Sequence, residues 1–533
     1  MSLLLLYFSL RLFSFFFSPE TPLVSQHWLN TAVSLIILLL TAYLLWRRDE
    51  RGWYIVAGEM ILGGAGGYLA VQGISLRTLL LLVSMAIFGI RQSEKRKTKN
   101  EKRINLTRTL LLSPPVIIIS IAGMFALRGY YNGHELRLII ADTLPYFFFL
   151  YAFPLINLLN SDKFKRFAWN AITAAIIGNA TLILLTFIGF SSGIFELQGS
   201  YYHWYRDIAL GKITDVGLGF YRLVLNEHLL LTPVIILLVS KILNNTRHHN
   251  FFSESANVAP PCEGGRGVLA AGNTNTHSVI GNCTANATSH PPTPLTGGTT
   301  TLLLGQLFLL ITILSINLTR IYMLALAVGL IFLFKKIYWK RWLLYSAATL
   351  ATLVISFTAI HLAASRGQSL GWELFGLRLQ SVIAPNIEES SLSRMLLLPK
   401  ILEKIKSNPI LGAGLGDTVT VYSPIFKQEV TTPHFDWGYL EIIAEMGIVG
   451  LIVWLTLLLF IAYHLHKIKP ASAGLYSSFT ALLVINLTSP ALFHVMGIVF
   501  LTVVLNCAML PRSLHNLAKL ESKVDGTHPE HAS

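Results

Sequence analysis

Four arginines of this sequence lie beside long apolar runs. A charged side chain is costly there, so its presence indicates a functional or structural role. Arg222 lies in GFYRLVLNEHLL and is expected to begin a helix, and Arg320 separates two apolar runs in LSINLTRIYMLALAVGL. Arg366 and Arg394 lie further along, in a long segment between apolar runs. A guanidinium is permanently charged and its planar fork binds phosphate through two N–H groups. Several such groups at one membrane face would suit a diphosphate; the alternative for each is snorkelling or structural pairing.

His434 is a candidate of a different kind, in the segment TTPHFDWGYLEIIAEMGIVG. Pro433 precedes it and Asp436 follows it, so a helix is expected to begin here. The amino terminus of a helix offers free N–H groups and a positive dipole end, which favour an anion. An imidazole can also take a proton from a hydroxyl near neutral pH. The alternative is an interfacial histidine with no chemical task.

Two further patterns exclude other chemistries. The run NPILGAGLGD contains Gly412, Gly414 and Gly416 and loosely resembles a dinucleotide-binding loop. That motif needs a buried strand before it and a helix after it in a soluble α/β unit, and neither is expected around this run. No Asp-x-Asp pair occurs in the segments expected outside the membrane. We therefore predict neither a nucleotide site nor a metal or other cofactor.

The elements that must position these residues are expected to be membrane-spanning helices. Of the 533 residues, 53% are hydrophobic and only 13% are charged, whereas a soluble protein carries about 25% charged residues. Apolar runs of about 20 residues, the length that crosses a bilayer, recur along the chain. Four of the clearest are Leu29–Trp46, Leu110–Leu127, Ala168–Phe190 and Leu440–Tyr463. Because backbone groups in lipid must be satisfied within each segment, we predict an all-α polytopic membrane protein with about 12–14 transmembrane helices.

The net charge of +14 follows the positive-inside rule and does not indicate nucleic acid. Basic residues gather in five loops between apolar runs, at 47–51, 91–108, 163–166, 335–341 and 467–469. Placing all five in the cytoplasm gives a consistent alternation with both termini inside. The apolar stretch Leu3–Phe17 is expected to be a first helix rather than a signal peptide, because Arg11 interrupts it and no cleavage site follows.

This topology divides the chain into six parts. We expect N-terminal transmembrane helices over 1–243, a low-complexity and disordered cytoplasmic insert over 244–300, transmembrane helices over 301–362, a large external loop over 363–437, C-terminal transmembrane helices over 438–512 and a cytoplasmic tail over 513–533. Apolar residues of the external loop recur at roughly helical spacing, at Leu392, Leu396, Ile401, Leu402 and Ile405. They predict an amphipathic helix that lies on the membrane or caps a cavity, with a simple surface helix as the alternative.

Several of these motifs together resemble the signature of the O-antigen ligase and O-antigen polymerase superfamily. In that family an arginine-bearing helix leads into a P-x-x-G-x-G turn, and a histidine then stands at the mouth of a helix that carries E-x-G-x-x-G. The matching positions here are Arg394, Pro409, Gly412, Gly414, His434, Glu445, Gly447 and Gly450. The Ser/Thr-Arg start of an upstream family helix maps onto Arg320, and a looser match maps onto Arg222.

The resemblance covers roughly residues 200–465 apart from the insert, and it departs from the family where Phe435 and Asp436 replace the common asparagine after the histidine. It implies a glycosyltransferase-C-like fold with short helices in the large external loop. It also implies a metal-independent transferase, with Arg222, Arg320, Arg366 and Arg394 as diphosphate-binding residues and His434 as the catalytic residue that activates the acceptor hydroxyl.

The donor that the resemblance implies is a glycan on undecaprenyl diphosphate, used at the periplasmic face of the bacterial inner membrane. The acceptor stays open between a glycan, a lipid A core and a protein, and membrane lipids are the remaining partners. A transporter or flippase of lipid-linked saccharides is the alternative from another class. Transporters bind their substrates near the midplane, often between inverted repeats. The ionisable residues here gather near one face and we find no convincing repeat, which favours an enzyme.

Overall fold

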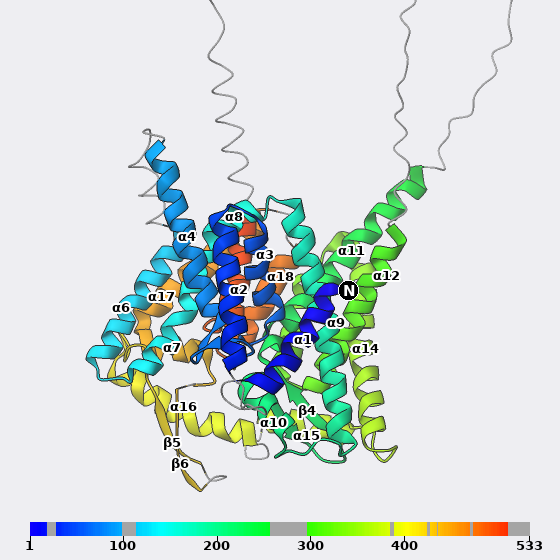
Figure 1. Ribbon diagram of the computed structural model, residues 1–533. Helices are drawn as coiled ribbons and strands as arrows, with labels where there is room; N and C mark the ends of the chain where they lie inside the picture. The colour runs from blue at the N-terminus through cyan, green and yellow to red at the C-terminus, as the bar shows by residue number, and fades with distance from the viewer. Residues whose placement is uncertain are drawn as a thin grey trace, which may run out of the picture.

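The computed structural model describes residues 1–18, 28–98, 113–255, 296–383, 389–423, 427–433, 435–468 and 473–509, and these form a bundle of helices (Figure 1). Within these ranges, nine helical segments are long and apolar enough to cross a membrane, and four further apolar helices have 10–17 residues. The prediction of an all-α polytopic membrane protein is therefore confirmed. Of the expected insert, residues 256–295 lie outside the described ranges, as does the tail 513–533. The division into six parts stays a prediction.

The long apolar segments follow the runs of low charge in the sequence. They are α2 (Trp28–Trp46), α4 (Leu76–Thr98), α6 (Pro114–Tyr131), α7 (Leu136–Phe147) with α8 (Ala152–Leu158), α9 (Asp162–Ser191), α11 (Leu231–Ser255), α12 (Thr296–Asn317), α14 (Trp339–Ala364) and α17 (Gly438–Lys467). The shorter apolar helices are α1 (Ser2–Phe17), α13 (Arg320–Phe332), α18 (Ala473–Ile485) and Val495–Met509. Residues 53–71 are also largely apolar, but they do not form a span of their own. The helix α3 (Arg51–Leu62) ends before Gly63, and a hairpin with strands of two residues follows, β1 (Ala70–Val71) with β2 (Ile74–Ser75).

The core of the bundle lies where α11 packs against α12, α13, α14 and α18. The side chains between these helices are aliphatic and fully buried, as at Ile236, Leu314 and Leu482. On the outer surface of the bundle, by contrast, the α2 side chains of Ile36 and Leu39 are 64% and 67% exposed. An exposed apolar face of this kind is costly in water and favourable in lipid. The described bundle therefore combines an apolar core with an apolar outer surface, as membrane proteins do.

Most of the short elements gather at one end of the bundle, which we call the α16 end; it is the lower end in Figure 1. These elements are α10 (Ser200–His203), β3 (Lys212–Asp215), β4 (Tyr221–Val224), α15 (Trp372–Ile383), α16 (Glu389–Ser407), β5 (Val419–Ser423) and β6 (Gln428–Thr432). The opposite end, which carries α8 and the end of α4, we call the α8 end.

The amphipathic helix predicted in the large loop is α16. Leu397 and Ile401 are buried on the face that packs against β5 and α17, whereas Leu402 is 41% exposed. The antiparallel hairpin β5–β6, which pairs Val421 with Val430, was not predicted. Its alternation of Val, Thr and Tyr is the available signal.

The expectation that Arg222 begins a helix is wrong. Arg222 lies in β4 and pairs with Thr214 in the antiparallel β3–β4 hairpin. The turn of this hairpin contains Gly217 and Gly219 with φ of 98° and 74°, a backbone region that glycine enters without steric cost. Aromatic and branched side chains then favour the extended strand, and the helical turns start only at Asn226.

Candidate functional site

Three of the candidate arginines meet at the α16 end, and each comes from a different element. Arg222 projects from β4, Arg320 is the first residue of α13, and Arg394 lies in α16. All three side chains are half-buried. These elements are far apart in the chain, so only tertiary contacts can bring the three arginines to one place.

Arg222 reaches the junction between α12 and α13. Its Nε donates a hydrogen bond to the carbonyl oxygen of Asn317 at 2.9 Å, and its Nη2 donates to Oγ1 of Thr319 at 3.0 Å. Asn317 is the last residue of α12, and Thr319 is the amino-terminal cap of α13. Leu318 between them has a φ of 50°, which makes the turn tight. A guanidinium is favourable here because the last carbonyls of a helix have no partner within it.

Arg320 continues this line of contacts into α16. It immediately follows Thr319, and its Nη2 donates to Oγ of Ser391 at 2.8 Å. Ser391 and Arg394 are three positions apart on α16 and therefore share a face of that helix. Arg394 in turn pairs with Asp436 at 3.8 Å between Nε and Oδ2. The structure thus connects Arg222, Arg320 and Arg394 through the polar side chains between them.

The remaining predicted site residues are placed differently. Arg366 follows α14 with a φ of 53° and an exposed side chain, which forms no hydrogen bond or ion pair with the described residues. No hydrogen bond or ion pair of its side chain connects it to the other three arginines within the described residues. His434 lies outside the described residues, although its neighbours do not: Phe435 is fully buried and α17 begins at Gly438. The role of His434 stays a prediction.

A chain of hydrogen bonds runs from Arg222 into the bundle. Oγ1 of Thr319 donates to Oδ1 of Asn317, and Nδ2 of Asn317 lies 2.7 Å from Nδ1 of His228. The backbone N–H of Leu225 also donates to that nitrogen, at 3.2 Å, so Nδ1 must be the acceptor. The imidazole is therefore neutral and carries its proton on Nε2.

The chain ends on an ion pair buried inside the bundle. Nε2 of His228 donates to Oδ1 of Asn179 at 3.2 Å, and Nδ2 of Asn179 donates to Oε2 of Glu227 at 3.1 Å. The other carboxylate oxygen of Glu227 accepts from Nη2 of Arg11 at 2.8 Å, and the Arg11 side chain is 3% exposed. We call the series Arg222, Thr319, Asn317, His228, Asn179 and Glu227 the polar chain.

Every donor in the polar chain points toward Glu227, so each hydrogen bond polarises the next in the same direction. One end is a guanidinium at the α16 end, and the other is a carboxylate neutralised by Arg11. The continuous hydrogen bonds from Arg222 to Glu227 hold these side chains in one arrangement, whereas Nε of Arg11 beyond them has no hydrogen-bond partner among the described residues. No motif of the sequence predicted a role for Arg11, Glu227 or His228. Their signal was the cost of an ionisable residue among apolar ones.

The glycine motifs of the sequence also meet in space. Gly447 has φ 64° and ψ −165°, which interrupts α17 and frees the backbone groups on both sides of it. The carbonyl of Ala444 accepts from the N–H of Ala413, and that of Glu445 accepts from the N–H of Gly414, both at 2.8 Å. A Cβ on Gly447 would lie 2.2 Å from the carbonyl oxygen of Ile410. The GAGLG run is therefore a turn that packs backbone against backbone on α17, which explains its glycines without a nucleotide.

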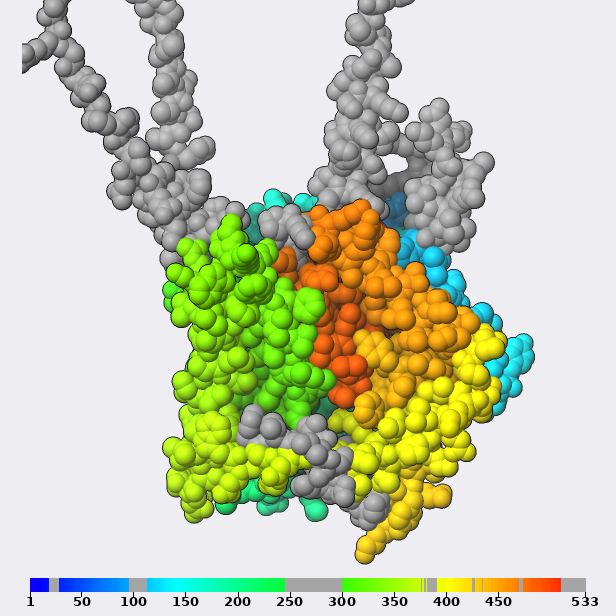
Figure 2. Space-filling model, turned by 180° about the vertical axis from the view of Figure 1, so that it is seen from behind, coloured from blue at the N-terminus to red at the C-terminus, as the bar shows by residue number. Residues whose placement is uncertain are grey.

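The polar residues around the start of α17 are Arg394, Asp436, Trp437, Glu441 and Glu445, and we call them the mouth of α17. They differ from the polar chain in their hydrogen bonding. Glu441 and Glu445 are 6% and 2% exposed, and each has one carboxylate oxygen without a partner among the described residues. Nε of Arg394, whose ion pair with Asp436 is longer than a hydrogen bond, and Nε1 of Trp437 are also buried and have no hydrogen-bond partner among the described residues. Figure 2 shows α16 and α17 lying against each other here, in yellow and orange. Within the described ranges, no group of three or more His, Cys, Asp or Glu residues is arranged to hold a metal ion.

Comparison with known protein families gives one match. Residues 306–455 match the family model described as O-antigen ligase. The matched region contains α13, α16, the glycine turn and the mouth of α17, so it carries two of the three connected arginines. No curated protein matches the chain significantly. The match supports the O-antigen ligase and polymerase superfamily and confirms the resemblance that the motifs predicted. The chain is thus a multi-pass membrane protein in which residues 306–455 are similar to the O-antigen ligase family.

Proposed function

We propose that this protein transfers a glycan from undecaprenyl diphosphate to an acceptor hydroxyl at the periplasmic face of the bacterial inner membrane. The observation that carries the proposal is the line of Arg222, Arg320 and Arg394 at one end of an apolar bundle, linked through Thr319 and Ser391. Lipid around the bundle gives the polyprenyl tail an apolar solvent. The guanidinium groups offer the diphosphate several donors at the level where the helices end.

The chemistry that this site would perform is a displacement at the anomeric carbon. The acceptor oxygen forms a bond to that carbon, and the bond between the carbon and the diphosphate oxygen breaks. The leaving diphosphate gains negative charge, which arginines that are already in place stabilise more in the transition state than in the ground state. The acceptor proton passes to a base, the role proposed for His434. Arg366, whose side chain is exposed, is proposed as a peripheral contact to the same diphosphate.

Reconstitution tests the proposal directly. Proteoliposomes that contain the full chain and a labelled undecaprenyl-diphosphate glycan would receive, in separate reactions, a lipid A-core acceptor, a second lipid-linked glycan or an acceptor protein, with a chelator and without added metal. We expect product with one of these acceptors. Arg320→Ala and His434→Ala should lower transfer at least about a hundredfold. The matched control is Arg206→Ala, which removes an exposed arginine from the same end of the bundle.

Three results would overturn parts of the proposal. Full transfer by both Arg320→Ala and His434→Ala would reject the site. Loss of activity in the chelator would reject a metal-independent mechanism. Movement of the labelled donor across the bilayer, without transfer to any acceptor, would instead assign the protein to the flippases.

A further inference from the structure

A second polar site lies at the α8 end, away from the candidate transferase site. A cavity of about 300 Å³ opens there between the α2–α3 connection, α4 and α8. Its lining combines apolar side chains, including Leu45, Ile87 and Phe88, with polar ones, including Arg48, Arg91 and Asn157. Apolar and charged groups in one lining suit an amphiphile.

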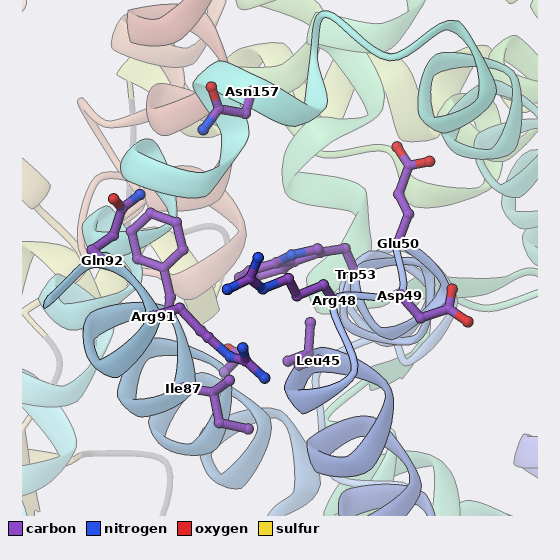
Figure 3. A pocket seen from close by; sticks show the side chains of 11 residues that line it. Leu45, Arg48, Asp49, Glu50, Trp53, Ile87, Arg91, Gln92 and Asn157 are labelled. Atoms are coloured by element: carbon purple, nitrogen blue, oxygen red, sulfur yellow. The ribbon is translucent and has the colours of Figure 1, made fainter. Parts of the chain in front are cut away.

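The two arginines approach the cavity from opposite sides. In Figure 3 the guanidinium of Arg48 extends from the α2–α3 connection and that of Arg91 extends from α4, and both point into the space between these elements. Nε of Arg91 is buried and has no hydrogen-bond partner among the described residues. Two like charges that face one shared space repel each other, and an anion between them removes this repulsion.

The nearby carboxylates do not supply that anion. Asp49 and Glu50 line the cavity, but their side chains point away from the two guanidinium groups in Figure 3. Asp49 pairs with Arg51 at 2.6 Å, and Glu50 accepts from the hydroxyl of Tyr54 at 3.2 Å. Glu94 lies 3.7 Å from Nη1 of Arg91, and its side chain is 49% exposed, so water screens this pair.

The level of the cavity along the helices identifies the ligand class. It lies where two candidate spans end, Trp28–Trp46 and Leu76–Glu94. The Arg91 guanidinium lies 4.9 Å from the ring centre of Trp46, and tryptophan is enriched at the boundary between lipid tails and headgroups. Basic pockets between helices at this level bind anionic lipid headgroups.

We propose that this cavity binds the phosphate of an anionic phospholipid from the surrounding bilayer. Arg48 and Arg91 hold the phosphate from two sides, and the apolar side chains of the lining cover the first part of an acyl chain. The site is independent of the transferase chemistry, because it lies at the other end of the bundle and shares no residue with the line of arginines at the α16 end.

The test compares two pairs of charge-removing substitutions in the full chain. One variant carries Arg48→Gln and Arg91→Gln; the matched control carries Arg47→Gln and Lys163→Gln, which remove two exposed charges at the same end without touching the cavity. Binding of phosphatidylglycerol and of phosphatidylcholine would be measured by native mass spectrometry. We expect the cavity variant to lose about tenfold in affinity for phosphatidylglycerol and the control to stay within about twofold.

Each outcome decides the proposal. An equal loss in both variants would assign the binding to general charge attraction and overturn the site, as would an unchanged affinity in the cavity variant. Inorganic phosphate that binds as tightly as phosphatidylglycerol would assign the cavity to a free anion and overturn the lipid assignment. If the glutamine variant does not fold, Arg48→Lys with Arg91→Lys replaces it. Because lysine lacks the planar fork, a clear loss of affinity is still expected, and its absence overturns the proposal.

Discussion

The polar chain and the mouth of α17 lie on two sides of the same candidate site, and their polar groups are satisfied to different degrees. From Arg222 to Glu227 each side chain of the polar chain donates to the next, and Arg11 neutralises the far end, where Nε of Arg11 lacks a hydrogen-bond partner among the described residues. At the mouth of α17, the buried atoms Nε of Arg394, Oε2 of Glu441 and Oε1 of Glu445 lack hydrogen-bond partners among the described residues.

The difference separates two roles within one site. Donors that are held in place before the substrate arrives stabilise developing charge without reorganisation, which suits Arg222 and Arg320. Polar atoms without partners are costly when buried, and a bound substrate can satisfy them. We infer that the polar chain is the fixed half of the site and that the mouth of α17 is the half that substrate binding completes.

The largest effect is expected at the buried end of the polar chain. Glu227→Gln would leave the Arg11 guanidinium buried without a counter-ion, which costs about 3–5 kcal/mol in the free energy of unfolding. Unfolding of the purified protein in detergent measures this cost. Replacing both partners, with Arg11→Met and Glu227→Met, should recover most of the lost stability because no isolated charge remains. A Glu227→Gln protein as stable as the native one would show that the pair is not fixed.

The next effect concerns the fixed arginines. Arg222→Lys keeps the charge but loses the planar fork whose Nε and Nη2 contact Asn317 and Thr319 together. We expect kcat/KM of the reconstituted transfer to fall about a hundredfold, or about 3 kcal/mol in transition-state stabilisation. Arg206→Lys, at an exposed site on the same end, should leave the rate unchanged. If Arg222→Lys retained the native rate, the positive charge of Arg222 alone would be sufficient and its planar geometry would not matter.

A smaller effect is expected where Asn317 connects the two halves of the chain. Asn317→Asp keeps the acceptor for Thr319 but removes the donor to His228, and Asn317→Leu removes both. One lost buried hydrogen bond costs about 1–3 kcal/mol, so transfer should fall about tenfold in the aspartate variant and further in the leucine variant. The loss should appear in kcat more than in KM, because these residues orient Arg222 and Arg320 rather than contact the substrate. Native rates in both the aspartate and the leucine variant would contradict a positioning role for Asn317.

The smallest effect is expected at the mouth of α17. The Arg394–Asp436 pair spans 3.8 Å and both side chains are partly exposed, so the pair contributes no more than about 1 kcal/mol. Asp436→Asn removes a carboxylate that competes with the diphosphate for Arg394. KM for the donor should therefore fall by up to about fivefold, with kcat nearly unchanged. A hundredfold loss in kcat would show instead that Asp436 takes part in the reaction, and that this half is as fixed as the other.

The sequence alone determined the class of the protein and singled out Arg222, Arg320 and Arg394 as candidate site residues. The shortage of charge and the repeated apolar runs predicted a helical membrane protein, because lipid replaces water as the solvent of its outer surface. The spacing of apolar residues predicted α16, and the motif residues from Arg394 to Gly450 predicted the family that the comparison supports. These properties are local, so periodicity and composition reveal them.

The tertiary structure decided which of those residues meet. It placed Arg222 in a strand, left Arg366 exposed, and packed the glycine turn on the interrupted helix at Gly447. It also formed the polar chain, in which Arg11 and Glu227 are 216 positions apart. Hydrogen-bond partners at such separations depend on how helices pack, and no local pattern records that packing. The sequence therefore shows that an arginine in an apolar segment needs a partner, and only the folded chain shows which partner it has.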